Sequence, residues 1–199
     1  MIAQGAEAIL TKKGNAIIKN RTKKGYRLPQ LDEKLRRQRT RKESKILQKI
    51  SSIIPVPRVI ASSEQTTTIL LEYIQGKKMS EHLDRLRNGK EICKVIGQHL
   101  AKLHDSNIVH GDLTTSNMIL APDNKLYFID FGLSFESSRA EDKAVDIHIL
   151  KEALKAKHYQ IAEAYFNAVV EGYTSSKNAS VVLERLKAVE KRGRYKSAY

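Results

Sequence analysis

The sequence predicts an α+β fold made of a small β-rich N-terminal part with one long helix and a mainly helical C-terminal part. Three observations predict this division. Short apolar runs rich in β-branched residues, separated by turn residues, recur before residue 75. One basic stretch, 34–49, carries its apolar residues at helical spacing, and beyond residue 76 that spacing dominates. The glycine-marked connection Ile74–Gly76 therefore separates an N-lobe, 1–74, from a C-lobe, 75–199, within a single domain.

Turn residues and caps place the elements of the N-lobe. Residues 1–19 are expected to form two short strands around a turn at Gly14. A helix is expected to begin near Asp32, a residue type suited to the N-cap, and to run through the basic stretch. Two more strands, at 56–61 and 67–73, follow the prolines that interrupt the helical pattern.

The C-lobe is expected to be helical except for one β-hairpin. The apolar runs Met118–Leu120 and Leu126–Ile129 flank a turn-forming stretch, which predicts the hairpin. A short polar helix is expected over 78–88, and apolar residues at helical spacing predict a core helix over 91–105. Three further helices are expected over about 141–156, 159–173 and 180–190.

Composition indicates a soluble, cytoplasmic protein. The hydrophobic content of 41% argues against general disorder. The single cysteine, Cys93, cannot form a disulfide within the chain, which is typical of a reducing compartment, and it is expected to be a small core residue. The first residues lack the basic and apolar regions of a signal peptide. No apolar run approaches the length of a membrane span, so no membrane contact is expected.

The charge is concentrated at the two ends of the chain. The formal net charge is +14, and residues 1–50 hold 15 lysines and arginines against 4 acidic residues, a balance of +11. A second basic cluster lies at 191–196. Two basic clusters suggest a polyanionic partner, with RNA as the first candidate. A solvated basic surface without a partner remains an equal alternative.

One stretch, 108–132, has a pattern suited to phosphoryl transfer. Asp112 is followed after five residues by Asn117, and Asp130 comes directly after the hairpin. Because a hairpin brings its two ends together, these three side chains should converge. Two carboxylates and an amide are hard oxygen ligands of the kind that Mg²⁺ uses when it bridges phosphates. Each of these motifs is weak alone, but their combination and order are specific.

A cation for the phosphates is expected from the N-lobe. Lys19 ends an apolar strand, and Glu43 is aligned with the apolar stripe of the basic helix. An inward carboxylate needs a cationic partner, and Lys19 is the natural candidate. The spacing alone leaves open a solvated Glu43 that pairs locally with Arg39 or Lys42.

These residues together resemble the protein-kinase superfamily over nearly the whole chain. Asp112, in the sequence His-Gly-Asp-Leu, is similar to the catalytic aspartate, and Asn117 and Asp130 are similar to the metal ligands. Lys19 and Glu43 match the strand lysine and its helix partner. The resemblance implies a minimal bilobal protein-kinase-like fold that binds ATP and Mg²⁺. It also implies nucleotide contacts from the reduced glycine loop and from the hinge between the lobes, namely Gly5, Ala6, Glu72 and Ile74.

Departures from the superfamily narrow the resemblance. Gly111 stands where kinases usually have arginine, and only thirteen residues separate Gly132 from Asp146, so the small C-lobe lacks an ordinary activation segment. Asp146 is expected to brace the catalytic-loop backbone, as the matching kinase aspartate does. The start Gln-Gly-Ala-Glu-Ala, the run 39–43 and the basic tail resemble the small atypical kinase subunit of the KEOPS complex, although Tyr195 interrupts that tail.

This narrower resemblance implies a serine/threonine protein kinase of no fixed specificity that also hydrolyses ATP. Its implied partners are the threonylcarbamoyltransferase subunit and the other KEOPS subunits, which together make threonylcarbamoyladenosine on tRNA, with tRNA meeting the basic N-lobe and the C-terminal tail. Two alternatives remain: a small-molecule phosphotransferase of the aminoglycoside type and a non-catalytic ATP-binding scaffold. RIO-type kinases are close in size, but they are expected to lack an Asp-Phe-Gly segment of this form.

Overall fold

The N-terminal sheet presents five strands, and every pairing in it is antiparallel. The computed structural model describes residues 3–4 and 7–196, with side chains for 7–192. The order in the sheet is β1-β2-β3-β5-β4. Gly14, with a φ of +59°, makes the expected turn between β2 and β3. The strands are β1 (Ala3–Gln4), β2 (Ala8–Lys13), β3 (Ala16–Arg21), β4 (Val59–Ser63) and β5 (Thr68–Glu72).

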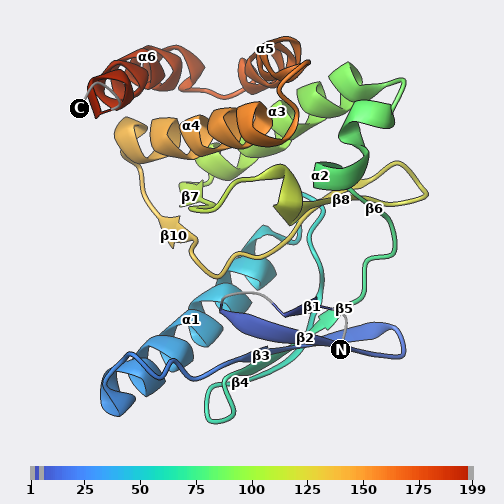
Figure 1. Ribbon diagram of the computed structural model, residues 1–199, viewed down its shortest axis with the longest axis vertical. Coiled ribbons are helices and arrows are strands. Elements are labelled where there is room, and N and C mark those ends of the chain that lie inside the picture. The colour runs from blue at the N-terminus through green and yellow to red at the C-terminus, as the bar shows by residue number, and fades with distance from the viewer. Residues whose placement is uncertain (1–2, 5–6, 197–199) are drawn as a thin grey trace.

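A single long helix, α1 (Pro29–Ile50), packs against this sheet (Figure 1). Its apolar stripe, Ile46, Leu47 and Ile50, is buried as the periodicity predicts. The prediction that Asp32 caps the helix is wrong. The N-cap position belongs to Leu28 and the proline follows it at the first turn, where its missing N–H costs nothing. Asp32 lies inside the first turn, where it accepts hydrogen bonds from the Lys24 backbone N–H and from Arg36.

The C-terminal part is mainly helical, as predicted, with two small sheets near the N-terminal sheet. Strands β6, β7 and β10 are too short to give a period of two, and the sequence did not predict them. No helix in the described part of the chain is both long and apolar enough to cross a bilayer. The elements are β6 (Lys77–Lys78), α2 (Met79–His82), the 3₁₀ turn η1 (Leu83–Arg85), α3 (Gly89–Asp105), β7 (Ile108–Val109), the 3₁₀ turn η2 (Thr115–Asn117), β8 (Met118–Leu120), β9 (Leu126–Phe128), β10 (Phe135–Glu136), α4 (Ala140–Lys157), α5 (Ala162–Tyr173) and α6 (Ala179–Lys196).

Helices α3 and α5 form the centre of the C-terminal part because two glycines let them approach closely. A Cβ on Gly97 would lie 2.0 Å from the Val169 carbonyl oxygen, and one on Gly172 would lie 2.0 Å from that of Lys94. Helix α4 then packs against α5 and α6 (Figure 1). Cys93 is fully buried on α3, as expected of a small core residue, and burial raises the pKa of its thiol to about 12.

One buried apolar cluster runs through both parts of the molecule and includes residues of α1, β5, α3 and β9. Polar contacts also join the parts. The Phe128 N–H donates to the Pro55 carbonyl at 3.1 Å, and Lys49 at the end of α1 pairs with Glu136 on β10 at 2.8 Å. The N-terminal sheet is thereby held against the hairpin β8–β9, and the candidate site lies between them.

Candidate functional site

The predicted hairpin is confirmed and brings Asn117 next to the residues that lead to Asp130. Strands β8 and β9 are antiparallel, with Met118 opposite Phe128. The register continues one residue further, because the Ile129 N–H donates to the Asn117 carbonyl at 2.9 Å. Asp130 follows in a left-handed conformation, with a φ of +62°. That conformation is uncommon for aspartate and turns the chain sharply at the point where the strand ends.

Asn117 and Asp112 are joined directly. The Asn117 Nδ2 group donates to the Asp112 backbone oxygen and to Asp112 Oδ2, each at 2.9 Å. Both N–H bonds of the amide are therefore used within the loop, and the carbonyl oxygen Oδ1 is left as the atom able to bind a cation. The same bonds hold the Asp112 carboxylate in place. We call residues 110–117 the catalytic loop, after the kinase segment that they resemble.

Lys19 lies between two carboxylates. Its Nζ is 2.7 Å from Glu43 Oε1 and 2.7 Å from Asp130 Oδ1. The predicted pair between Lys19 and Glu43 is confirmed, and local pairing of Glu43 is wrong, because Arg39 bonds to Glu7 instead. The contact places the lysine of the N-terminal sheet against the carboxylate that follows the hairpin. The two walls of the site therefore meet at one ammonium group.

Arg21 is a member of this network that the sequence did not reveal. It is buried, and its guanidinium donates to Glu43 Oε2, the oxygen that Lys19 leaves free. A Cβ on Gly132 would lie 2.9 Å from an Arg21 nitrogen, so the arginine also contacts the segment after Asp130. The only signal in the sequence was its position two residues after Lys19, on the same face of the strand. Two cations and two carboxylates thus form a balanced cluster.

The charges in this cluster shift one another's pKa values. Burial alone would raise the pKa of Asp130, but the nearby Lys19 ammonium outweighs burial and holds the pKa of that carboxyl below its usual range. Burial would lower the pKa of Lys19, but Glu43 and then Asp130 raise it above the usual range. Both groups are therefore charged at neutral pH, and the ion pair between them is intact.

Asp146 on α4 braces the catalytic loop, as expected. Its carboxylate accepts the backbone N–H groups of His110 at 2.8 Å and Gly111 at 2.9 Å, and it lies 3.3 Å from His104 Nε2. Burial alone would raise the pKa of this carboxyl, but the bond from His104 and the other donors keep it below the usual range. The fully buried Asp146 therefore stays ionised and fixes the start of the loop.

The backbone conformation at Gly111 and its close approach to Leu133 explain why arginine is absent from this position. Its φ is +78°, and a Cβ there would lie 2.6 Å from the Leu133 carbonyl oxygen. The loop passes too close to the backbone after Gly132 for any side chain. His110 beside it is fixed by two bonds, because its Nε2 donates to the Ile129 carbonyl at 3.1 Å while its Nδ1 accepts from the Asp112 N–H at 3.3 Å. That pattern assigns the neutral tautomer with the proton on Nε2.

A cleft of about 340 Å³ opens between the N-terminal sheet and the hairpin. Lys19, Asn117 and Asp130 line it, together with Glu72 and Ile74 from the predicted hinge. Asp112 lies behind Asn117 and is not part of this lining. Gly5 and Ala6 lie outside the described residues. The cleft also has apolar lining residues that only tertiary contacts reveal and that the sequence did not predict: Leu10, Ile17, Leu71, Ile119 and Ile129.

The donor set of the cleft fits Mg²⁺ that is shared with a polyphosphate. Among the described residues, no three histidine, cysteine or acidic side chains converge as a complete metal cage. Mg²⁺ commonly takes one or two carboxylates and completes its shell with phosphate oxygens and water. The half-exposed Asp130 carboxylate and the Asn117 carbonyl could supply that share. The apolar walls suit a planar base, and Lys19 suits phosphate.

Comparison with known families gives a consistent match. The sequence model of the RIO domain family matches residues 12–158. The match includes Asp130–Gly132, the Asp-Phe-Gly segment of this chain. A crystal structure of WbdD with the kinase inhibitor LY294002 has a similar fold, with a TM-score of 0.57 and 16% identity over 91% of this chain and 48% of that one.

Three curated proteins show the relationship in sequence. The KEOPS complex subunit Bud32 of Pyrococcus abyssi is 40% identical over 90% of this chain and 84% of its own length. The EKC/KEOPS complex subunit BUD32 of Encephalitozoon cuniculi is 38% identical over 98% of this chain and 95% of its own. A probable bifunctional tRNA threonylcarbamoyladenosine biosynthesis protein of Methanobrevibacter smithii is 40% identical over 98% of this chain, which spans 36% of that protein.

Proposed function

This chain belongs to the kinase-like RIO domain family and is a homologue of the KEOPS subunit Bud32, and from this premise we propose that it turns over ATP with Mg²⁺ as a regulatory subunit of a KEOPS complex. The observation that carries the proposal is the position of Lys19 in an apolar cleft, 2.7 Å from both Glu43 and Asp130. In that position one ammonium can leave Asp130 and contact a phosphate while Glu43 still holds it.

The site residues predicted from the sequence have separate roles in this proposal. The backbone of Glu72 and Ile74 meets the base at the hinge, and Lys19 contacts the α- and β-phosphates. Gly5 and Ala6 are proposed to cover the phosphates. These contacts position the nucleotide before any chemistry takes place, and positioning supplies much of the catalysis in phosphoryl transfer.

The reacting end of the nucleotide would meet the catalytic loop. Bound Mg²⁺ would neutralise charge on the phosphates, with Asn117 Oδ1 and the Asp130 carboxylate as its protein ligands. Asp112 would orient the attacking hydroxyl or water and accept its proton. The two bonds from Asn117 support this role, since they hold the Asp112 carboxylate at a fixed angle to the metal ligands. Asp146 keeps the start of the loop rigid.

The phospho-acceptor is proposed to come from a partner or from water. Only residues 133–139 separate Gly132 from α4, and two of them pair with β7 as β10. This segment is too short to hold a peptide beside Asp112. The names of the homologues support the threonylcarbamoyltransferase subunit and the other KEOPS subunits as partners in forming threonylcarbamoyladenosine on tRNA. A serine/threonine kinase activity and an ATPase activity are both compatible with this arrangement.

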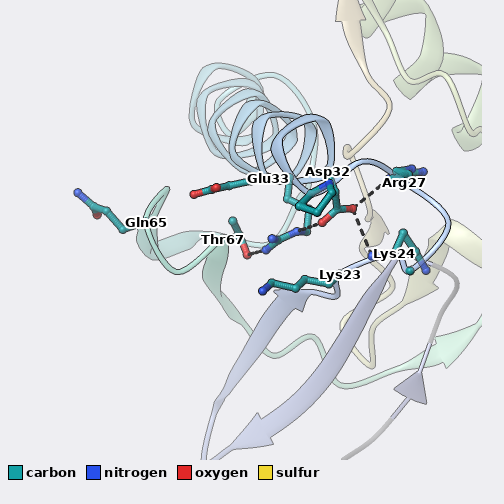
Figure 2. A pocket seen from close by; sticks show the side chains of 10 residues that line it. Lys23, Lys24, Arg27, Asp32, Glu33, Gln65 and Thr67 are labelled. Atoms are coloured by element: carbon teal, nitrogen blue, oxygen red, sulfur yellow. Dashed lines mark hydrogen bonds and ion pairs between the residues drawn. The ribbon is translucent and has the colours of Figure 1, made fainter.

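The basic surface of the N-lobe is proposed to contact tRNA. A cavity of about 490 Å³ lies at the start of α1. Figure 2 shows Asp32 in its wall, between Arg27 and the Lys24 backbone. The arginines in this cavity are thus held by Asp32, whereas Lys23 at its edge is exposed. The solvent side of α1 adds further exposed lysines, Lys34, Lys42 and Lys45. The cluster at 191–196 continues beyond the side chains that the structure describes, and Arg192 within it pairs with Glu141.

One experiment tests the proposal directly. ATP consumption is measured for the purified chain alone, with its transferase partner, and with the partner and tRNA, and phosphosites are mapped in the same samples. We expect Mg²⁺-dependent turnover that rises with the partner. Transfer to a small alcohol would instead favour a small-molecule phosphotransferase. Binding of ATP and Mg²⁺ by calorimetry without turnover in any of the samples would instead favour a non-catalytic ATP-binding scaffold.

A further inference from the structure

We propose that His158 is a positioning residue for the catalytic loop, held by Asp84 and acting through Thr115. This inference rests on the proposed function of the loop. The three side chains come from three separate elements: Asp84 from η1, Thr115 from η2 and His158 from the residue that follows α4. None of them lines the nucleotide cleft.

The contacts form a continuous chain of hydrogen bonds. His158 Nδ1 lies 2.5 Å from Asp84 Oδ1, and His158 Nε2 lies 3.1 Å from Thr115 Oγ1. His158 and Thr115 are both buried, whereas the Asp84 carboxylate is half-exposed at the outer end. The backbone of His158 is also fixed, since its N–H donates to the Leu154 carbonyl at 2.7 Å. A buried imidazole with both nitrogens bonded has a single orientation.

The order of donors follows from the chemistry of the groups. The Asp84 carboxylate can only accept, so His158 Nδ1 carries a proton. In the neutral ring Nε2 is then an acceptor, and the Thr115 hydroxyl donates to it. No other hydrogen-bond partner of the Thr115 hydroxyl is found among the described residues. Removal of the imidazole would therefore leave a buried hydroxyl unsatisfied and the turn around it without its anchor.

The location of Thr115 connects this series of hydrogen bonds to the proposed reacting groups. Thr115 is the first residue of η2, the turn that ends at Asn117, and the Asn117 N–H donates to the Thr114 carbonyl at 3.0 Å. A change in this turn would move the Asn117 amide, which holds Asp112. The anchor at His158 thus fixes the distance between the orienting aspartate and the metal ligand.

Helix α4 contacts the catalytic loop at two points. Asp146, in its second turn, accepts from the start of the loop, and His158, just past its end, contacts the final turn. His158 lies twelve positions after Asp146, which corresponds to about 18 Å along the helix. One rigid element therefore sets both ends of the loop, and η1 fixes the outer end of the helix through Asp84. These contacts set the position of the catalytic loop and leave the lining of the nucleotide cleft unchanged.

The test uses two substitutions that break the series of hydrogen bonds and one that preserves part of it. His158→Ala removes the anchor, Thr115→Val removes only the hydroxyl, and His158→Gln keeps a group that can bond to Thr115. We expect kcat for ATP turnover, measured with the partner present, to fall about 10- to 100-fold for the first two, since small displacements have effects of this size. KM for ATP should change little, and Gln should restore part of kcat.

His148→Gln is the matched control, because His148 lies on α4 and, among the described residues, makes no hydrogen bond to the loop, and its Nδ1 is unbonded. It should leave kcat unchanged. A double variant of His158→Ala and Thr115→Val should lose no more than either alone, since both act through one contact. Melting curves identify any variant that fails to fold, and Thr115→Val, the smaller change, then decides the question.

The outcomes separate this inference from the proposed function. A wild-type kcat in folded His158→Ala and Thr115→Val would overturn the positioning role. So would variants in which KM for ATP rises while kcat stays intact. If the wild-type chain itself shows no turnover, the proposed function fails. Amide hydrogen exchange at residues 114–117 then tests the anchor without activity: faster exchange in His158→Ala supports it, and unchanged exchange overturns it.

Discussion

Lys19 Nζ lies 2.7 Å from Asp130 Oδ1, so an ammonium on β3 and the carboxylate after β9 form an ion pair across the cleft. Glu43 holds the same ammonium from the other side at 2.7 Å. Asp130 is therefore both the proposed metal ligand and a direct partner of the lysine proposed to contact phosphate. The first two predictions below follow from this shared position.

Asp130→Ala is expected to abolish Mg²⁺-dependent ATP turnover while the fold survives. The carboxylate is half-exposed, so its loss leaves little buried surface unfilled, and Lys19 keeps Glu43 as its partner. Turnover assays with and without Mg²⁺, together with a melting curve, check this outcome. A wild-type rate in a variant that melts normally would remove Asp130 from the site.

The pH dependence of stability should report the same ion pair. Asp130 has a lowered folded pKa, so its contribution is present above its unfolded pKa of about 3.9 and is lost as pH falls through the folded value. Lys19 has a raised folded pKa, so its contribution is full below about pH 10.4 and is lost as pH rises through the folded value. The difference in melting temperature between wild type and Asp130→Asn should be level from about pH 5 to 9 and shrink below it. An unchanged difference at pH 3 would contradict this.

Glu43→Gln is expected to destabilise the chain strongly. The fully buried carboxylate neutralises Lys19 and Arg21, and its loss leaves two buried cations with Asp130 as the nearest anion. Breaking one side of a buried ion pair costs about 3–5 kcal/mol in free energy of unfolding, measured by denaturant titration. Glu33→Gln, which removes an exposed partner of Arg37, is the control and should cost under about 1 kcal/mol. Equal effects of the two changes would argue against the buried network.

Gly111→Ala should destabilise the chain more than Gly14→Ala. Both glycines have a positive φ, but the new Cβ at Gly111 would lie 2.6 Å from the Leu133 carbonyl, whereas nothing lies within 4 Å of the one at Gly14. The change at Gly14 should cost about 1 kcal/mol from backbone strain alone. The change at Gly111 adds a steric clash and displaces the loop, so ATP turnover should fall as well. Denaturant titrations of both variants compare the two costs, and equal values would contradict the close approach.

Affinity for tRNA is expected to fall steeply with salt concentration because the contacts are to phosphates. Each lost phosphate contact should reduce the slope of log K against log salt by about 0.7–0.9. Replacing Lys34 and Lys45 on α1 by alanine should lower both affinity and slope. The control replaces Lys125 and Lys155, which removes the same charge from the C-terminal part. A flat salt response, or an equal loss in the control, would indicate a merely solvated basic surface.

Local patterns predicted the parts of the site that depend on local spacing. The hairpin followed from two apolar runs around a turn, and the pair of Lys19 with Glu43 followed from strand order and helical spacing. Arg21 and His158 could not be found in this way, because their partners lie on elements distant in sequence. The error at Asp32 has the same origin. Its hydrogen bonds to the preceding loop and to Arg36 place it inside the helix, and a residue preference cannot show that.

The fold shows a similar division. Long periodic segments such as α3 were predicted within two residues of their start and at their end, because period and burial agree there. The two-residue strands β7 and β10 were missed, since pairing across the chain is their only determinant. Gly111 was noticed only as a departure from a motif. Its cause is the nearby backbone of Leu133, which no property of the sequence around Gly111 encodes.

The balanced cluster of Lys19, Arg21, Glu43 and Asp130 would make the proposed nucleotide binding an exchange of partners. The four charged groups already pair with one another, so a phosphate that binds Lys19 would have to replace Asp130, and a metal that binds Asp130 would have to replace Lys19. Each displaced group gains a new partner only if phosphate and metal arrive together. Nucleotide and Mg²⁺ should therefore bind with positive cooperativity, and either one alone should bind weakly.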